Sequence, residues 1–488
     1  METMVFEPSM LLAILPEIGL VVLAATLLVF DLVWKDQRCG RLGLYTAFGI
    51  TVIAILSAIF ARPAAEPQLI FGGMLRLDSA SYVFRMIFLM GAGLTALFAI
   101  KQESLCLHGE FYVLMLISTL GLSLMAASAD LIMLYLSIET ASIPLYALAG
   151  FLIHDKKSVE AGIKYLLFGA MTSAIMLYGF SLMYGFTGTT ALYQLAEGFV
   201  AGNLPLLPLA AASLMVLAGF GFKISAVPFH FWAPDVYEGA ASPIAGFMST
   251  VSKAAGFAVL LRVLLALYPG GVGNLWTVTI AILSGVSMII GNLLALAQKN
   301  IKRLLAYSSI AQAGYILIGV AAGTEIGVSA AIYYLMAYLV SNLAAFGLVA
   351  IVGQAVGSDE IDAYTGLSRR APLLGLVMLI SLLSLGGIPP FAGFFGKFWV
   401  FGSAIQSGMA WLAILGVLNS VVGLYYYLRV LKVVYLDRSA DEGLPLKLVP
   451  PWSFALAVCA IGILVLGFLF APWYEWATQA AQALASIY

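Results

Sequence analysis

Residues 327–353 read GVSAAIYYLMAYLVSNLAAFGLVAIVG, a run of apolar and small residues without a single charged side chain. About 20 such residues cross the hydrocarbon core of a bilayer as an α-helix. Runs of the same kind cover residues 9–33, 42–61, 80–99, 111–128, 130–151, 161–186, 204–229, 240–268, 275–297, 302–322, 372–402, 409–436 and 452–473. The sequence therefore predicts an all-α polytopic membrane protein with about 14 transmembrane helices.

The composition of the whole chain agrees with this prediction. Hydrophobic residues make up 62% of the 488 residues and charged residues 10%, and the mean hydropathy is +1.04. A soluble domain is usually about 45–50% apolar and about 25% charged. These values exclude a soluble enzyme and a disordered chain, and a net charge of −1 offers no basic face to a nucleic acid. The runs are also too long for a transmembrane β-barrel, whose strands alternate over about 10 residues.

The lysines and arginines of the predicted loops are distributed unequally between the two sides of the membrane. Loops that follow odd-numbered spans define the first side, and they hold Lys35, Arg38, Arg41, Lys101, Lys156, Lys157, Lys299, Lys302, Arg303, Arg369, Arg370, Arg438 and Lys447. Loops on the second side hold only Arg62 and Arg76. Because cytoplasmic loops carry the excess of positive charge, the first side is predicted to be cytoplasmic. An even number of spans then places both termini on the opposite side.

The loops and the cysteines offer no sign of a further domain or redox centre. The longest predicted connections, such as 354–371, have fewer than 20 residues. Cys39, Cys106 and Cys459 are odd in number, far apart and without C-x-x-C spacing. They are expected to be inert apolar residues, neither a disulfide framework nor iron–sulfur ligands. The cluster Tyr425–Tyr427 is expected to serve packing or an interfacial belt.

Four pairs of short segments recur along the chain at offsets of 172, 169, 174 and 167 residues. The pairs are 135–141 with 307–313, 161–166 with 330–335, 219–223 with 393–397, and 261–264 with 428–431. The offset covers five spans, an odd number, so the two copies must lie upside down relative to each other. We therefore expect two inverted five-helix repeats, 111–270 and 275–436. Three N-terminal helices, 1–110, precede them, and a C-terminal helix with a short tail, 437–488, follows.

Among the charged side chains inside predicted spans, five are singled out as candidates for function. They are Glu139, Lys164, Lys223, Lys253 and Lys397. A charge at the bilayer centre costs about 2.5–3.5 kcal/mol, so these residues need compensation or a function. A static ion pair of Glu139 with one lysine would account for only two of them. Because burial favours the neutral form of a lysine and a nearby carboxylate favours the charged form, the set suits a proton relay.

Two of the lysines lie beside predicted helix breaks. Lys223 precedes Pro228 in the seventh span, and Lys397 follows Gly386-Gly-Ile-Pro-Pro390 in the twelfth. A proline removes a backbone hydrogen bond and kinks a helix, and interrupted helices carry the binding sites of many transporters. Ordinary proline kinks are the alternative. His230 could pass protons between neighbouring lysines or lie at the membrane interface.

Several of these stretches resemble a known family. They are 143–151, 160–170 (EAGIKYLLFGA), 221–240 (GFKISAVPFHFWAPDVYEGA), 300–315 (NIKRLLAYSSIAQAGY) and 387–400 (GIPPFAGFFGKFWV), together with the opening LLAILPEIGLVVLAATLLVFDL. They are similar to the antiporter-like membrane subunits of respiratory complex I, the bacterial NADH–quinone oxidoreductase. The resemblance covers nearly the whole chain.

The resemblance implies that the chain translocates protons in the membrane arm while electron transfer occurs in other subunits. By position, the fifth-helix glutamate and the lysines of the sixth, seventh, eighth and twelfth helices correspond to Glu139, Lys164, Lys223, Lys253 and Lys397. M-type subunits of the family carry glutamate in the twelfth helix, and L-type subunits continue into a long lateral helix. Lys397 in the twelfth helix and the short tail after the last span indicate the N-type branch of this family.

The resemblance also implies the surroundings of the chain. No cofactor is expected in this chain, and NADH, FMN, iron–sulfur clusters and quinone would be used by other subunits. The expected partners are a neighbouring antiporter-like subunit, small membrane subunits and the lipid of the bacterial inner membrane, with both termini periplasmic. Three alternatives stay open: a subunit of a cation/proton antiporter, a subunit of a membrane-bound hydrogenase-type complex, and a structural scaffold whose charges only lock helices together.

Overall fold

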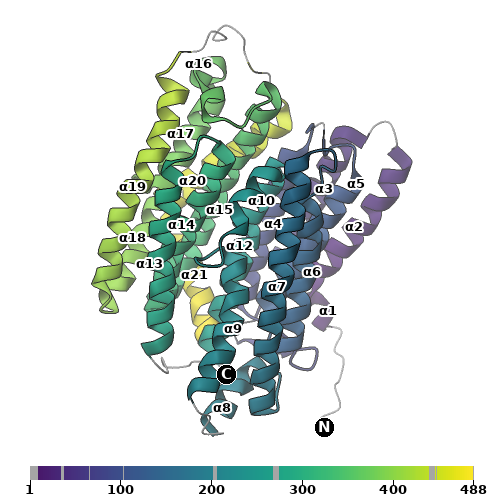
Figure 1. Cartoon of the computed structure of the whole chain (residues 1–488). Coiled ribbons are helices and arrows are strands. Elements are labelled where there is room, and N and C mark those ends of the chain that lie inside the picture. Colours follow the sequence, from purple (N-terminus) through teal and green to yellow (C-terminus); the bar gives the residue numbers. More distant parts are fainter. Residues whose placement is uncertain are drawn as a thin grey trace.

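The computed structural model describes residues 9–34, 38–64, 66–102, 104–201, 206–267, 274–438, 446 and 448–486. Nearly all of these residues lie in helices (Figure 1). Because lipid offers no hydrogen-bond partners, a spanning backbone must satisfy its own N–H and C=O groups, and a helix does so within one segment. The predicted all-α polytopic membrane architecture is confirmed.

The helices of the first half are α1 (Ser9–Ala13), α2 (Leu15–Trp34), α3 (Arg38–Phe60), α4 (Ser79–Ala99), α5 (Gly109–Ala127), α6 (Leu131–Ala149), α7 (Lys156–Thr187), α8 (Leu192–Ala201), α9 (Leu206–Ile224), α10 (Trp232–Gly239), α11 (Ser242–Phe247), the π-helix η2 (Met248–Ser252) and α12 (Lys253–Leu267). Those of the second half are α13 (Asn274–Leu296), α14 (Ile301–Ala322), α15 (Glu325–Val356), the 3₁₀-helix η3 (Ile361–Tyr364), α16 (Leu367–Arg370), α17 (Pro372–Gly386), α18 (Ala392–Gln406), α19 (Ala410–Tyr435), α20 (Pro450–Phe468) and α21 (Phe470–Ala485). One antiparallel hairpin, β1 (Gln68–Ile70) with β2 (Leu75–Leu77), lies between α3 and α4 and departs from the all-helical expectation.

Thirteen described helical segments are long and apolar enough to span a membrane. The remaining predicted span, 372–402, is present as two shorter helices, α17 and α18, that meet at a break. The seventh predicted span is also broken, since α9 ends at Ile224 and the chain resumes as α10 at Trp232. Both predicted interruptions are therefore confirmed. The short tail expected after the last span is instead a further helix, α21.

The irregular backbone at both breaks is partly exposed, at Pro228, Pro389 and Pro390, but several of its polar groups have partners within the protein. At the first break the Val227 N–H donates to Ser287 Oγ of α13 at 2.9 Å. At the second break the Gly393 N–H donates to Ser384 Oγ at 3.1 Å. Gly387 adopts a φ of +82°, a conformation that favours glycine. Irregular backbone at membrane depth must have its freed polar groups satisfied by other parts of the protein, and these two hydrogen bonds do so for one N–H group at each break.

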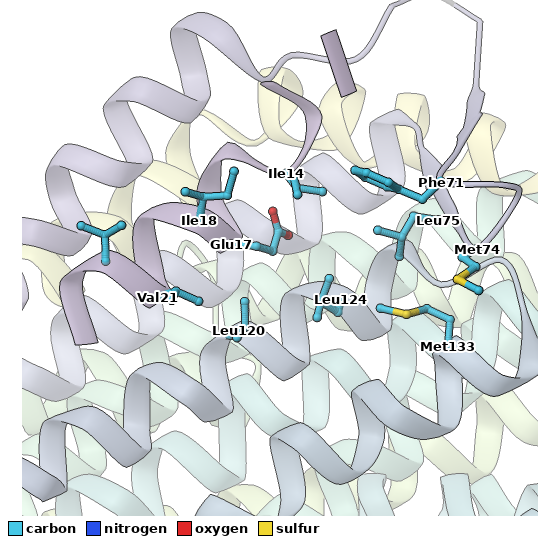
Figure 2. A pocket seen from close by; sticks show the side chains of 11 residues that line it. Ile14, Glu17, Ile18, Val21, Phe71, Met74, Leu75, Leu120, Leu124 and Met133 are labelled. Carbon is cyan, nitrogen blue, oxygen red and sulfur yellow. The ribbon is translucent and has the colours of Figure 1, made fainter. Parts of the chain in front are cut away.

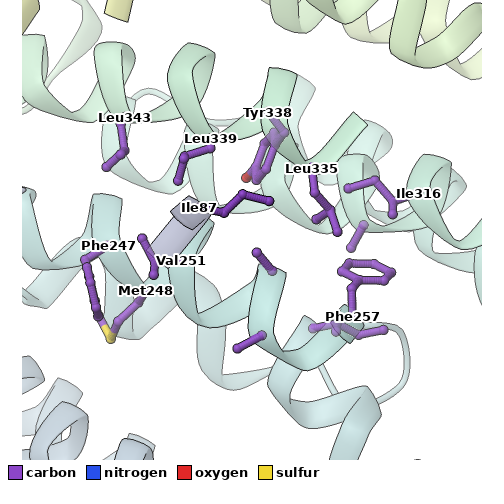
Figure 3. Packing of buried hydrophobic residues seen from close by; sticks show 14 of the residues in the cluster. Ile87, Phe247, Met248, Val251, Phe257, Ile316, Leu335, Tyr338, Leu339 and Leu343 are labelled. Atoms are coloured by element: carbon purple, nitrogen blue, oxygen red, sulfur yellow. The ribbon is translucent and has the colours of Figure 1, made fainter. Parts of the chain in front are cut away.

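The N-terminal helices α2 and α3 lie at one edge of the bundle, and α18 and α19 lie at the other (Figure 1). Between them lies α15, whose apolar stretch is fully buried. Figure 3 shows its side chains Leu339 and Leu343 beside Met248 and Val251 of η2, all members of one buried cluster. Helices in lipid associate by close packing. One continuous core therefore joins the first half of the chain to the second.

Corresponding helices of the two expected repeats have similar lengths and breaks. The long helices α7 and α15 contain the matched segments 161–166 and 330–335, and each has 32 residues. The broken pairs α9–α10 and α17–α18 contain the matched segments 219–223 and 393–397. These correspondences support the repeat. Its inverted relation and the four unit boundaries stay predictions.

The second-side end of the bundle brings both ends of the described chain together (Figure 1). The Arg76 guanidinium of β2 donates to the carbonyl oxygens of Ala483, at 3.3 Å, and Ser486 at the end of α21. The Arg85 guanidinium of α4 donates to the carbonyl oxygen of Ala13 in α1 at 3.0 Å. The first and last described helices therefore lie at the same end of the bundle, as an even number of spans requires.

Two of the cysteines contradict the expectation of inert residues. Cys39 and Cys106 form a disulfide, whereas Cys459 is free and buried. The start of α3 and the turn after α4 lie at the same first-side end of an antiparallel helix pair. Folding therefore brings together two residues that are 67 positions apart in the sequence, a proximity that spacing rules for local motifs do not detect.

Candidate functional site

Lys223 lies in the last turn of α9, at the first helix break, and is buried. Its ammonium donates a hydrogen bond to the hydroxyl of Ser142 on α6. One turn earlier on α6, the partly buried Glu139 accepts a hydrogen bond from the hydroxyl of Ser173 on α7. Glu139 forms no salt bridge with any described lysine. The static ion pair considered from the sequence is therefore absent, and each group instead has a hydroxyl partner.

The start of α6 fixes which side chains face Lys223. The carboxylate of Asp130 caps this helix by accepting hydrogen bonds from the N–H groups of Ile132, at 2.8 Å, and Met133, at 3.2 Å. Residues three apart on a helix share a face. Glu139 and Ser142 therefore project together toward the helices that carry their partners.

Lys253 is the first residue of α12, directly after the π-helix η2, and is fully buried. Single π-helical turns occur frequently at functional sites. The ammonium donates to both the hydroxyl and the carbonyl oxygen of Ser309 on α14, each at 2.9 Å. One turn later, Gly256 packs closely on Lys223, since a Cβ at Gly256 would lie 3.1 Å from the Cβ of Lys223. Lys223 and Lys253 therefore flank one contact between α9 and α12.

Lys397 lies in α18 just after the second break, and it too is buried. Its ammonium donates to the carbonyl oxygen of Gly386 at 3.1 Å, a group left free where α17 ends. It also lies 4.5 Å from the ring centroid of Tyr315, within the range of a cation–π contact. A Cβ at Gly387 would lie 2.8 Å from the Lys397 side chain. The glycine at the break therefore makes room for the lysine.

Hydroxyl groups on α14, a helix of the second repeat, extend from the partner of Lys253 toward α19. Ser308, the neighbour of Ser309, forms a 2.5 Å hydrogen bond with the hydroxyl of Tyr427 on α19. Tyr427 is buried, whereas Tyr425 is exposed. Tyr426 is buried as well, and its hydroxyl donates to Asn292 Oδ1 at 3.1 Å. The tyrosine cluster expected to serve packing or an interfacial belt thus contributes two residues to the polar interior.

Gln312, one turn after Ser308 on α14, continues this line toward Lys397. Its amide donates to the hydroxyl of Tyr427 at 3.2 Å and to the carbonyl oxygen of Leu385 at 3.0 Å. Its carbonyl accepts from the hydroxyl of Tyr334 at 2.5 Å. Leu385 immediately precedes the glycine carbonyl that Lys397 contacts. The polar surroundings of Lys253 and Lys397 are therefore joined through α14.

Lys164 does not belong to the buried set. Its side chain is 36% exposed and pairs with Glu160 on its own helix at 2.7 Å and with Asp235 of α10 at 2.5 Å. Arg303 at the start of α14 reaches Asp235 at 2.7 Å and Glu238 at 2.8 Å. Lys164 lies in the outer turns of α7, in agreement with its position early in the sixth predicted span, and it is a paired and partly exposed charge.

These charges belong to a first-side cluster formed by Lys157, Lys164, Asp235, Glu238 and Arg303. Lys157 contacts Glu238 at 2.7 Å. Burial alone would raise the pKa of Asp235, but hydrogen bonds from Lys164 and Arg303 outweigh burial and lower it. Burial alone would also raise the pKa of Glu238, but hydrogen bonds from Lys157 and Arg303 outweigh burial and lower it. The cluster ties α7, α10 and α14 together beside the first break.

His230 follows the first break and is buried. Burial argues against an exposed position at the membrane interface, one of the two alternatives for this residue. Its Nδ1 atom has no hydrogen-bond partner in the described part of the chain, and neither Lys223 nor Lys253 is hydrogen-bonded to the ring there. A part for His230 in proton transfer stays a prediction.

Comparison with known proteins identifies the family. The family described as NADH:quinone oxidoreductase/Mrp antiporter, transmembrane, matches residues 128–423. The chain belongs to this antiporter family. The match extends from just before α6 into α19, and so contains Glu139, Lys223, Lys253 and Lys397.

Individual relatives in this antiporter family cover nearly the whole chain. The NADH-quinone oxidoreductase subunit N of Moorella thermoacetica is 43% identical over 95% of this chain and 96% of its own. A chain of respiratory complex I from Thermus thermophilus with bound aureothin superposes with a TM-score of 0.79 at 34% identity, covering 94% and 98% of the two chains. A chain of the membrane-bound sulfane sulfur reductase, an archaeal respiratory membrane complex, gives a TM-score of 0.87 at 25% identity over 98% of both.

A second set of buried charges in this antiporter-family chain escaped the sequence prediction. It is the second-side cluster, formed by Glu17, Arg76, Asp78, Arg85 and Arg262. Glu17 pairs with Arg85 at 2.9 Å, and Asp78 pairs with Arg262 at 2.8 Å and Arg76 at 3.3 Å. Arg76, expected in a loop, lies in β2. Glu17, Arg85 and Arg262 each fall within a predicted span, and that position was the available signal.

Proposed function

We propose that this chain is a proton-translocating membrane-arm subunit of a bacterial NADH–quinone oxidoreductase, placed in the inner membrane with both termini periplasmic. The higher sequence identity to a subunit N than to the sulfur reductase chain supports this assembly. A neighbouring antiporter-like subunit and small membrane subunits would be its partners. This chain would bind no cofactor, and the chemistry of NADH, FMN, iron–sulfur clusters and quinone would occur in other subunits.

The observation that carries the proposal concerns the relay lysines, Lys223, Lys253 and Lys397. All three are buried, and within the described structure none forms a salt bridge; their polar partners are hydroxyl and carbonyl oxygens. A buried cation that must stay charged normally has a paired counter-charge. Neutral oxygens accept hydrogen bonds from an ammonium and also from a neutral amine. Each lysine can therefore gain and lose a proton without losing its partners.

The arrangement suggests an order of transfer. Lys223, poised by Glu139, would accept a proton from the first side, and Lys253 would receive it across the contact between α9 and α12. The hydroxyls of Ser308 and Tyr427 would then lead toward Lys397, from which the proton would leave toward the second side. Hydroxyl groups both donate and accept hydrogen bonds, so they suit the intermediate positions.

Lys164 and His230 would have supporting parts in this scheme. Lys164 would hold α10 in place through Asp235, because its exposed ion pairs make it a poor store for a mobile proton. His230 lies on the chain between the first break and α10, where its unpartnered Nδ1 could bind a water molecule near Lys223.

The test replaces Glu139 and Lys223 separately in the assembled complex. Glu139→Ala and Lys223→Met should leave the amount of complex close to wild type and should lower proton translocation coupled to quinone reduction by about tenfold or more. Glu110→Ala and Lys432→Ala serve as matched controls, because both side chains are exposed. Assembly together with a wild-type proton-to-electron ratio and rate in both variants would leave only the scaffold interpretation.

A further inference from the structure

A cavity of about 480 Å³ lies between α2, α5 and the β1–β2 hairpin (Figure 2). Ten of its eleven lining side chains are apolar, and the eleventh is Glu17. This volume falls within the range of about 300–1,000 Å³ typical of small-molecule sites. The cavity is separate from the relay lysines, none of which lines it. The proposed proton relay therefore does not explain what occupies this cavity.

The lining shows that the cavity opens sideways toward the bilayer. Val21 and Val22 on α2 line it and are 53% and 55% exposed on the outside of the bundle. Glu17 lies in the first turn of α2, at the second-side end of that span. Because a helix rises 1.5 Å per residue, the carboxylate lies about 7 Å closer to the membrane surface than Val22. A polar group near the second-side end of the span is thus followed by an apolar groove toward the middle of the span.

The carboxylate of Glu17 is only half satisfied. Its Oε1 faces the Arg85 guanidinium at 2.9 Å and accepts a hydrogen bond from the Ser123 hydroxyl at 2.5 Å. Its Oε2 has no hydrogen-bond donor among the described residues. Water cannot readily supply one, because the side chain is only about 5% exposed. Figure 2 shows this carboxylate among the apolar side chains Ile14 and Leu124. A buried acceptor without a partner is costly, so a donor from the occupant would stabilise the site.

We propose that this cavity binds an aminophospholipid, whose primary ammonium donates to Glu17 Oε2 and one acyl chain of which lies along Val21 and Val22. An ammonium offers both positive charge and N–H donors to a carboxylate. A quaternary choline nitrogen has no N–H to donate. No lysine or arginine is among the lining residues, so an anionic headgroup without an amine has no cationic partner here.

The experiment compares lipids bound to the purified, delipidated complex after incubation with defined lipids. Phosphatidylethanolamine, phosphatidylcholine and phosphatidylglycerol of equal chain length are supplied separately, and lipid retained per complex is counted by native mass spectrometry. Retention of the ethanolamine lipid should exceed that of the choline lipid by about tenfold, as expected for a hydrogen bond to a charged group.

Two variants and one control locate the bound lipid. Glu17→Gln removes the charge, and Val21→Trp fills the groove while leaving the Glu17–Arg85 pair intact in case the first variant weakens the fold. Both should abolish the preference for the ethanolamine lipid, and Glu66→Ala, an exposed acid near the hairpin, should keep it. Equal retention of the ethanolamine and choline lipids by the wild type, or an unchanged preference in both variants, overturns the proposal. So does a photo-crosslinker at position 22 that captures a neighbouring subunit instead of lipid.

Discussion

The relay lysines and the second-side cluster are both buried charges, but the protein holds them in different ways. In the second-side cluster every arginine lies against a carboxylate. The relay lysines have hydroxyl, carbonyl or aromatic partners and form no salt bridge among the described residues. Arginine stays protonated in proteins, whereas a buried lysine can release its proton. We therefore propose that the lack of a direct salt bridge, and not burial alone, distinguishes a charge that moves protons.

The largest effect is expected where a relay lysine is removed. Lys397→Met should reduce proton translocation by about 100-fold or more, because a positioned proton carrier contributes about 10²–10⁴-fold. The stability of the complex should change little, because methionine of similar length replaces an unpaired buried charge. Proton uptake by reconstituted liposomes and thermal melting measure the two quantities. Lys432→Met on the exposed face of α19 is the control. Near-normal proton translocation by Lys397→Met would contradict the proposed functional difference between the relay lysines and the second-side cluster.

The second-side cluster should respond in the opposite way. Arg262→Met leaves Asp78 buried with one fewer partner, and breaking such a pair costs about 3–5 kcal/mol. The melting temperature and the yield of complex should fall, while the complex that does assemble should keep the wild-type proton-to-electron ratio. Arg62→Met, at an exposed position, controls for loss of an arginine. Wild-type stability with impaired translocation would instead assign this cluster to the relay.

An intermediate effect is expected at the hydroxyl that holds the first relay lysine. Ser142→Ala removes the oxygen partner of Lys223, and a hydrogen bond to a charged group contributes about 1.5–3 kcal/mol. Proton translocation should fall by about tenfold with little change in assembly. Thr140→Ala on the same helix is the matched control, because that hydroxyl bonds only its own helix backbone among the described contacts. Equal effects of both substitutions would show that hydroxyl loss on α6 acts nonspecifically.

The smallest effect is expected in the first-side cluster and should depend on pH. The pKa of Asp235 is lowered in the folded chain, so its stabilising contribution is present above the ordinary value of 3.8 and is lost as pH falls through the lowered folded value. Because the side chain is about one third exposed, Asp235→Asn should cost about 1 kcal/mol or less at pH 7. The difference in melting temperature between wild type and variant should shrink below pH 3.8. A constant difference from pH 7 to pH 3 would contradict this assignment.

The sequence predicts the parts of this molecule that depend on local physics. The length of apolar runs, the cost of a charge in lipid and the effect of Pro228 or Pro390 on a helix are properties of short segments, and they located the spans, the breaks and the relay lysines. The hydrogen-bond partners of the relay lysines depend instead on which helices pack together. Ser309 and Tyr427 are ordinary polar residues until α14 packs against α12 and α19, and the Cys39–Cys106 disulfide joins turns that only folding brings together.

The second-side cluster was only partly predictable from the sequence. Glu17, Arg85 and Arg262 were visible as charges within apolar runs, but sequence position near the end of a span does not separate an interfacial charge from a buried pair. The C-terminal helix α21 was likewise expected as a tail, because its alternation of polar and apolar residues is weaker than the signal of a membrane span. Its role in covering the β hairpin became visible only through the contacts of Arg76.

The most direct test of the account is the proton-to-electron ratio of the complex that carries Lys253→Arg, measured in sealed liposomes during NADH oxidation and compared with Lys253→Met. Arginine preserves the positive charge beside Ser309 but does not release its proton. If Lys253 carries protons, both variants should assemble and both should show a reduced ratio or a block of coupled turnover. A wild-type ratio and rate in Lys253→Arg would show that a fixed positive charge suffices, and would contradict the relay.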